Sequence, residues 1–351
     1  MDIFKDALKV FFIVSIFFNI VLYPMTSPFH DGYLAHLNKF TGFSEEVFHE
    51  EGLLKEKNEF MFSSFIGDAK SYSRMVMGEE VISPYKYRLL YPAIVKLFSN
   101  FWFGSTTSIP IQNTTIWLNF ILVFLIFIIS NSLFKKYTIR YSVWISLLII
   151  SLPAIFKTFP LLMLEIPSIV CILLLLSNLE KPLLLTLILV LSMLVKEVFV
   201  LSFFLVINQY LLRKRMVFLL ISIIPIIMFL GTRYLFKDDL LSVNYGWNLS
   251  KGEFHMRYLN WAFASWKVSI KTFMKMAYVL SPLILYYLLP KNRNISEFIN
   301  LNLGNFIFLF TVLISGVCLS AYHIRPWGIL TPVTLYMIFN YRQELLSKFE
   351  N

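Results

Sequence analysis

Long apolar runs separated by short polar breaks dominate the sequence. A first run from Leu8 to Tyr23 is followed by others at about 114–134, 141–157, 159–178, 182–195, 197–212, 216–236, 266–290, 303–320 and 326–341. A helix needs roughly 20 apolar residues to cross a bilayer, and the runs come in blocks of about this length. The pattern predicts an all-α polytopic membrane protein, with residues 1–351 forming one transmembrane domain of about ten crossings.

The composition supports this class. Hydrophobic residues make up 58% of the 351 residues and charged residues only 15%, whereas soluble domains carry roughly 25% charge. The formal net charge of +10 does not indicate nucleic acid as a partner, because most basic residues stand at the ends of apolar runs. Cys171 and Cys318 both lie inside apolar runs, so neither a disulfide framework nor a thiolate metal site is expected. The first run has no small-residue cleavage site after it and is interpreted as a retained signal anchor.

Clusters of Lys and Arg in the short breaks predict the topology. They are Lys135, Lys136 and Arg140; Lys181; Arg213, Lys214 and Arg215; Lys291 and Arg293; and Arg342 and Lys348. Short loops rich in Lys and Arg stay on the cytoplasmic side. If Leu89–Phe103 lies in the membrane interface, all these clusters fall on the cytoplasmic side. If Leu89–Phe103 crosses the membrane, two of the clusters fall on the outer side. We therefore expect an interfacial Leu89–Phe103, an outer loop over 25–113 containing interfacial helices, and both termini in the cytoplasm.

This topology places the remaining charged residues near the membrane on one face, which suggests one site. Glu165 stands a turn or two from the outer end of its helix, and either snorkels to the surface or has a function. Lys196 and Glu197 interrupt about thirty apolar residues, which predicts either two short crossings with a structural ion pair or a broken helix lining a polar cavity. Arg325 either binds a phosphate or anchors to lipid head groups, and His323 has no partner at metal-ligand spacing.

The stretch from Gly67 to Pro92 is unlike the apolar runs, because it is rich in charge, Tyr, Pro and Gly. It contains a carboxylate, several phenol groups and an arginine, at Asp68, Tyr72, Tyr85, Tyr87 and Arg88. Beside a membrane surface, such a set suits a sugar and a phosphate together. The alternative is an outer loop with ordinary solvated charges.

Three motifs together resemble bacterial members of the GT-C superfamily, the integral-membrane glycosyltransferases that use polyprenyl-phosphate-linked sugars. The first is the series Asp68, Tyr72, Gly78, Pro84, Tyr85, Tyr87, Arg88, Leu89 and Pro92. The second is Glu165 followed by Pro167. The third is Lys196–Glu197 with a late Arg325 and Pro332. The resemblance extends from about residue 60 to residue 335.

This resemblance implies a GT-C-like bundle in the bacterial inner (cytoplasmic) membrane, with the active site on the periplasmic or outer face. It implies inverting transfer of a sugar from a polyprenyl phosphate to a glycan or lipid-linked acceptor. Asp68 would be the general base, Glu165 a second catalytic candidate, and Arg88, Lys196 or Arg325 would stabilise the leaving phosphate. The remaining candidates for substrate binding are Tyr72, Tyr85, Tyr87, Glu197 and His323. Membrane lipids are the other expected partners; no metal site is identified, and a divalent metal cofactor is left open.

Two other functions remain as alternatives. A polymerase or ligase that joins preassembled oligosaccharides would need a richer arginine cluster in the outer loops. A transporter or flippase of lipid-linked sugars would favour internal repeats and charges near the middle of the membrane in both halves, and neither is visible. The sequence contains no P-loop, GxGxxG or HExxH motif.

Overall fold

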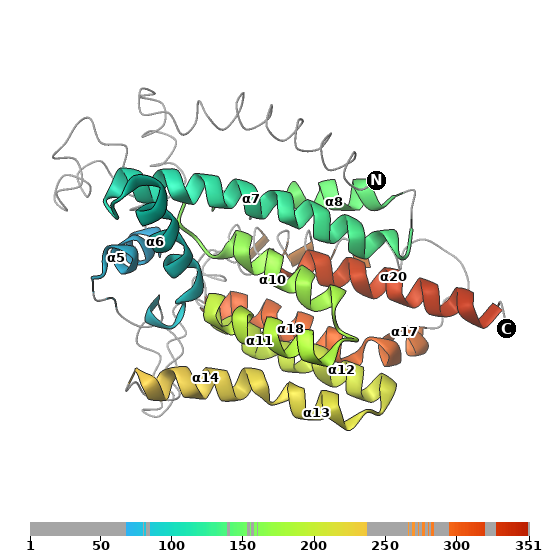
Figure 1. The fold of residues 1–351 in the computed structure, drawn as a ribbon. Helices are drawn as coiled ribbons and strands as arrows, with labels where there is room; N and C mark the ends of the chain where they lie inside the picture. The colour runs from blue at the N-terminus through green and yellow to red at the C-terminus, as the bar shows by residue number, and fades with distance from the viewer. Residues whose placement is uncertain are drawn as a thin grey trace. The chain divides into compact units, whose positions relative to one another are not determined.

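The described part of the protein is mostly helical. The computed structural model describes residues 68–79, 81, 85–138, 141–152, 155, 158–159, 161–236, 295–319 and 328–349, with scattered helical positions from 266 to 283. These residues form α-helices and short 3-10 helices, and no β-strand occurs among them (Figure 1). The predicted all-α class is confirmed for this part of the chain. The first apolar run, His323 and Arg325 are not among the described residues.

The chain divides into two compact units, which we describe separately. Unit 1 comprises Met1–Val81, Pro92–Phe124 and Lys157–Met163, and unit 2 comprises Ile82–Tyr91, Leu125–Phe156 and Leu164–Asn351. Helix α6 (Leu90–Phe103) and helix α7 (Ser108–Lys135) each contribute residues to both units.

Unit 1 contains α5 (Asp68–Met77), most of α6 and the first half of α7. Helix α5 ends at Gly78, whose φ of +89° is the left-handed conformation that glycine adopts at little cost. The buried amide of Asn119 on α7 donates hydrogen bonds to the carbonyl oxygens of Phe159, at 2.7 Å, and Leu161, at 3.2 Å. This side chain thereby ties a non-helical segment to the long helix.

Besides the 3-10 turn η3 (Tyr85–Tyr87), unit 2 contains the remaining helices whose bounds the structure describes. They are α8 (Ser142–Ile150), α10 (Glu165–Ser177), α11 (Pro182–Val195), the 3-10 helix η4 (Glu197–Ser202), α12 (Phe203–Arg213), α13 (Met216–Ser222), α14 (Ile224–Leu235), α17 (Ile295–Leu301), α18 (Leu303–Leu319) and α20 (Leu330–Phe349). Helix α10 packs on α11 and α20, while α12 packs on α13 and α18. The 3-10 helix η4 contacts four helices, α11, α12, α14 and α18.

The chain reverses direction twice between α10 and α12, which gives this group of helices two distinct ends. At one end, Lys196 after α11 returns to Glu165 at the start of α10. At the other end, Arg213 at the end of α12 returns to Glu180 in the turn before α11. We call these the Glu165 end and the Glu180 end. Tyr137, which follows α7, packs on Tyr336 and is influenced by the charge of Glu180, so it also lies at the Glu180 end.

Two helical segments are long and apolar enough to cross a bilayer, judged by length and composition alone. They are Pro110–Lys135 and Met216–Leu235, and the latter includes α13 and α14. Pro225 lies at the start of α14, where its missing N–H and its ring interrupt the helix after Ser222. Three shorter apolar helices span Glu165–Ser177, Pro182–Val195 and Leu303–Ser315. The predicted number of about ten crossings is not established by these helices.

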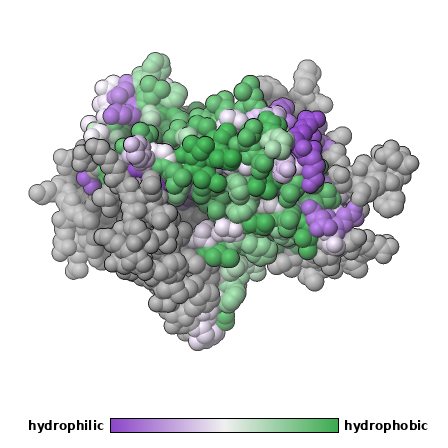
Figure 2. Space-filling model, turned by 90° about the horizontal axis from the view of Figure 1, so that it is seen from below, coloured by the Kyte–Doolittle hydropathy of each residue, from purple (hydrophilic) through white to green (hydrophobic). Residues whose placement is uncertain are grey.

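The surface of α13 and α14 is apolar. Leu220, Ile223, Ile227 and Leu230 are all exposed, and Figure 2, which views this side, is largely green there. Arg213, Lys214 and Arg215 are exposed in the turn between α12 and α13. A basic turn therefore lies next to this exposed apolar face.

Several element boundaries differ from those expected from the sequence. The apolar run 159–178 becomes helical only at Glu165, so this residue begins α10 instead of lying a turn or two inside it. The reason is Pro167, which is accommodated at the third position of α10, where a backbone N–H has no intrahelical partner anyway. Helix α8 similarly ends at Ile150, shortly before Pro153.

Helices α12 and α18 approach each other closely at Gly304. The side chain of Asn208 accepts a hydrogen bond from the backbone N–H of Gly304 at 2.9 Å and donates one to the carbonyl oxygen of Leu301 at 3.1 Å. A Cβ atom at position 304 would lie 2.2 Å from the backbone oxygen of Phe204. Only glycine therefore fits at this crossing.

Candidate functional site

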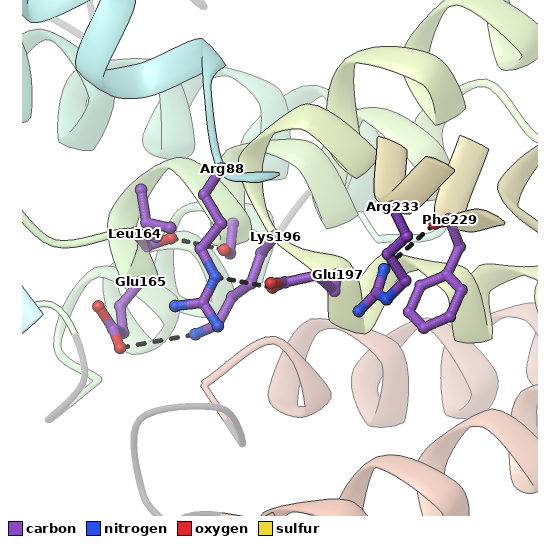
Figure 3. Close-up of polar contacts among 8 residues, drawn as sticks. Arg88, Leu164, Glu165, Lys196, Glu197, Phe229 and Arg233 are labelled. Atoms are coloured by element: carbon purple, nitrogen blue, oxygen red, sulfur yellow. Dashed lines mark hydrogen bonds and ion pairs between the residues drawn. The ribbon is translucent and has the colours of Figure 1, made fainter. Parts of the chain in front are cut away.

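Four charged side chains from three distant segments meet at the Glu165 end of unit 2. Arg88 follows the 3-10 turn η3 (Tyr85–Tyr87), and Glu165 begins α10. Lys196 follows α11, and Glu197 begins η4. The Nε of Arg88 donates a hydrogen bond to Oε2 of Glu197 at 2.7 Å, and Nζ of Lys196 lies 3.6 Å from Oε1 of Glu165 (Figure 3). We call these four residues the charged quartet.

The local backbone explains how these side chains come together. Glu165 is favourable as the first residue of α10, because a carboxylate interacts well with the positive end of the helix dipole. The first turn is also held by the Ser168 hydroxyl, which donates to the carbonyl oxygen of Leu164. Lys196 is extended, with φ −158° and ψ 135°, so α11 stops there and the chain restarts as η4 at Glu197. The two adjacent residues thus pair with different segments.

The charged quartet is largely removed from solvent. The side chains of Arg88 and Lys196 are each 15% exposed, that of Glu197 is 12% exposed and that of Glu165 is 6% exposed. Two cations and two carboxylates balance in formal charge, which is the condition under which buried ionic groups are tolerated. Oε1 of Glu197 is buried and accepts no hydrogen bond from the described residues.

Aromatic rings and a further arginine lie beside the charged quartet. The guanidinium of Arg88 lies over the Tyr85 ring at 5.5 Å, and both Tyr85 and Tyr87 are buried. Arg233 of α14 is fully buried, and its guanidinium lies 4.7 Å from the centre of the Tyr87 ring. Figure 3 shows Arg233 and Phe229 beside the quartet residues.

Sequence reasoning did not identify Arg233, although a signal was present. It is a charged residue within the apolar run 216–236, in the last turn of its helix. The same type of signal led to Glu165. Charged groups inside apolar helices are costly unless they are paired or hydrated, so each one indicates a specific environment.

The other candidates from the sequence lie in unit 1 or outside the described residues. Asp68 is the first residue of α5 and Tyr72 is buried one turn later, both in unit 1. The side chain of Asp68 lies outside the described residues, as do His323 and Arg325. The structure therefore brings together Arg88, Glu165, Lys196 and Glu197 with Tyr85 and Tyr87.

The side chains that can bind a ligand at this site are charged. Within the part of the chain that the structure describes, no three His, Cys, Asp or Glu side chains group together as metal ligands. Glu165 and Glu197 each face a cation. Guanidinium and ammonium groups in a low-dielectric setting bind phosphate and carboxylate oxygens strongly. The site can therefore bind an anionic group and, through carboxylate oxygens, hydroxyl donors.

No protein-family model, curated protein or solved structure matches this chain.

Proposed function

We propose that the protein is a membrane glycosyltransferase that moves a sugar from a polyprenyl-phosphate donor to a glycan or lipid-linked acceptor. The observation that carries this proposal is the charged quartet: two cations and two carboxylates are drawn from distant segments to one end of apolar helices. Burying charged groups costs free energy, so it is expected where the charges bind a ligand or take part in a reaction. The resemblance to the GT-C superfamily rests on residues that include all four.

The two cations suit the donor phosphate. Arg88 binds Glu197 through Nε, and a guanidinium has five N–H donors in a planar fork, so it can bind a phosphate as well. Lys196 adds a second positive charge at the same end of the helices. As the sugar–phosphate bond breaks, the leaving polyprenyl phosphate gains negative charge, and these cations stabilise that charge.

The carboxylates suit the sugar and the acceptor. Following the resemblance, Asp68 takes the proton of an acceptor hydroxyl as its oxygen attacks the anomeric carbon. One C–O bond forms, the bond from the anomeric carbon to the phosphate oxygen breaks, and the configuration inverts. Glu165 and Glu197 hold Lys196 and Arg88 in position and accept hydrogen bonds from sugar hydroxyls.

We place this site on the outer face of a bacterial inner membrane, with both termini in the cytoplasm. The predicted bundle of about ten crossings and the outer loop over 25–113 belong to the same proposal. The apolar surface of α13 and α14 supports a lipid environment. The polyprenyl chain would lie among the helices, within the bilayer.

The test is transfer by purified protein in proteoliposomes supplied with a panel of polyprenyl-phosphate-linked hexoses and pentoses and membrane glycolipid acceptors. We expect Asp68→Asn to lower transfer by about 10²–10⁴-fold, the usual contribution of a general base. Arg88→Gln should lower it by about 10²–10³-fold, as expected when a donor to a developing charge is lost. The matched controls Glu79→Gln and Arg213→Gln remove charges from exposed pairs and should leave transfer unchanged.

Surface glycans of a deletion strain provide the second arm of this test. Mass spectrometry should show the loss of one sugar, restored by the wild-type gene and not by Asp68→Asn, with both proteins inserted at equal levels. A wild-type level of product from Asp68→Asn would remove Asp68 as the base. Movement of the donor across the proteoliposome membrane without sugar transfer would replace the enzyme proposal with a flippase.

A further inference from the structure

Arg233 is a fully buried arginine that contributes none of the four charges of the quartet. Its side chain has 0% relative exposure, although arginine is rarely buried completely. It stands in the last turn of α14, at the Glu165 end of unit 2. Its Nη1 donates a hydrogen bond to the backbone carbonyl oxygen of Phe229, one turn earlier in the same helix, at 3.2 Å. The guanidinium is thus held against its own helix.

Two aromatic rings enclose the guanidinium of Arg233. The Cζ atom lies 3.4 Å from the centre of the Phe229 ring and 4.7 Å from the centre of the Tyr87 ring. Both distances are within the roughly 6 Å range of cation–π attraction, which becomes stronger when the cation is removed from water. Phe229 belongs to α14, whereas Tyr87 belongs to η3 and is far away in the sequence. Arg233 therefore links η3 to α14.

Further contacts hold the same turn on the end of α14. The ring of Tyr87 packs edge-on against Phe236 at 5.8 Å, and Nζ of Lys86 lies 5.9 Å and 5.8 Å from the centres of these two rings. The next residue after Tyr87 is Arg88, and its Nε donates to Glu197. Arg233 holds the side chain of Tyr87, and Tyr87 is joined directly to Arg88. The position of the Arg88 guanidinium thus depends on the position of Tyr87.

We infer that Arg233 is a positioning residue, which fixes Tyr87 and thereby directs the guanidinium of Arg88 toward the charged quartet. The inference rests on the proposed function, because it explains the role of a residue assigned there to the donor phosphate. Lysine at position 233 keeps a cation over the rings, whereas methionine keeps the length and loses the charge. A positioning role therefore predicts that lysine substitutes for Arg233 and methionine does not.

The experiment measures the mobility of the turn directly, with a nitroxide label on a cysteine at position 89, next to Arg88. Leu89 is exposed, so Leu89→Cys accepts a label without disturbing packing. The full-length protein is used in lipid nanodiscs, with Cys171→Ala and Cys318→Ala to remove the native thiols. A second label at the exposed Leu220 on α13 reports on the unit as a whole. Arg213→Met, which removes an arginine from the Glu180 end, is the matched control.

We expect Arg233→Met to increase the mobility of the label at 89 and to leave the label at 220 unchanged. Arg233→Lys and Arg213→Met should leave both labels as in the wild type. Phe229→Leu, which removes one ring and keeps the cation, should give an intermediate mobility at 89 and provides a second route if Arg233→Met does not fold. In the transfer assay, Arg233→Met should lower kcat/KM by about 100-fold, as a small displacement of a binding group does, while Arg233→Lys keeps most of it.

The outcomes separate this inference from the proposed function. Equal mobility at 89 in the wild type, Arg233→Met and Phe229→Leu would overturn the positioning role. Increased mobility at both 89 and 220 would also overturn it, because Arg233 would then stabilise the whole unit. Absence of transfer by the wild type would overturn the proposed function, and the label results would still decide whether Arg233 orders the turn.

Discussion

The two ends of the α10–α12 helices carry ion pairs in opposite environments. At the Glu165 end, the four side chains of the quartet are 6% to 15% exposed. At the Glu180 end, Arg213 and Glu180 are 36% and 71% exposed. Exposed pairs contribute about 0–1 kcal/mol each, and buried pairs often contribute less than apolar residues of the same size would. The exposed pair needs no functional explanation, whereas the buried quartet calls for one.

The largest expected effect is a difference in thiol labelling, because we expect the Glu165 end and the Glu180 end to lie on opposite sides of the membrane. Tyr234→Cys at the Glu165 end should react with a membrane-impermeant thiol reagent added outside intact cells, whereas Arg215→Cys at the Glu180 end should not. Both native residues are exposed, and Met216–Leu235 is long enough to separate them by a bilayer. The two cysteines should react equally after the cells are opened. Outside labelling of Arg215→Cys would mean that Leu89–Phe103 crosses the membrane.

The next effect is the cost of removing one partner from each kind of pair. Glu197→Ala should lower the free energy of unfolding by about 3–5 kcal/mol, because the buried Arg88 would lose the carboxylate to which its Nε donates. Glu180→Ala should lower it by no more than about 1 kcal/mol, because Arg213 can be hydrated. Denaturant unfolding in mild detergent measures both.

A double replacement sharpens this comparison. Arg88→Met combined with Glu197→Leu removes both charges and should recover most of the stability lost in Glu197→Ala. Sugar transfer should remain absent in the double variant. If transfer returns with stability, the buried pair is structural and the proposed role of Arg88 is wrong.

The smallest effect is a pH dependence at the Glu180 end. Burial raises the pKa of Tyr137 from 10.0 to about 12. The folded protein therefore holds this proton more tightly than the unfolded chain does. Its contribution to stability is fully present below pH 10 and is lost as the pH rises toward 12, at a cost of about 1–2 kcal/mol. Tyr137→Phe should remove this dependence, and tyrosinate absorbance should detect the shifted titration. Ionisation of Tyr137 near pH 10 would contradict its burial against Tyr336.

Sequence patterns predicted the helices best where local signals were strong. The run 182–195 coincides with α11, because Pro182 suits a helix start and the charged residues Lys181 and Lys196 flank the run. The interruption at Lys196–Glu197 was also expected, and the extended Lys196 followed by η4 confirms it. The start of α10 was misplaced, because hydrophobicity continues through 159–164 while the backbone of the residues described there, 159 and 161–164, is not helical.

The arrangement of the charged quartet was less accessible from the sequence. Lys196 and Glu197 stood out as an adjacent pair, yet their partners lie far away, with Arg88 separated from Glu197 by 109 positions. No local pattern determines which opposite charges meet across such a distance. The contact between Arg233 and Tyr87 was inaccessible for the same reason, since the two residues come from different segments and only packing brings them together.

The glycine at position 304 has a mechanical consequence. Since the backbones of α12 and α18 touch there and Asn208 bridges them, sliding of one helix along the other is blocked. Any movement that opens unit 2 must then carry α12 and α18 together as one rigid body, and its hinge must lie at another position.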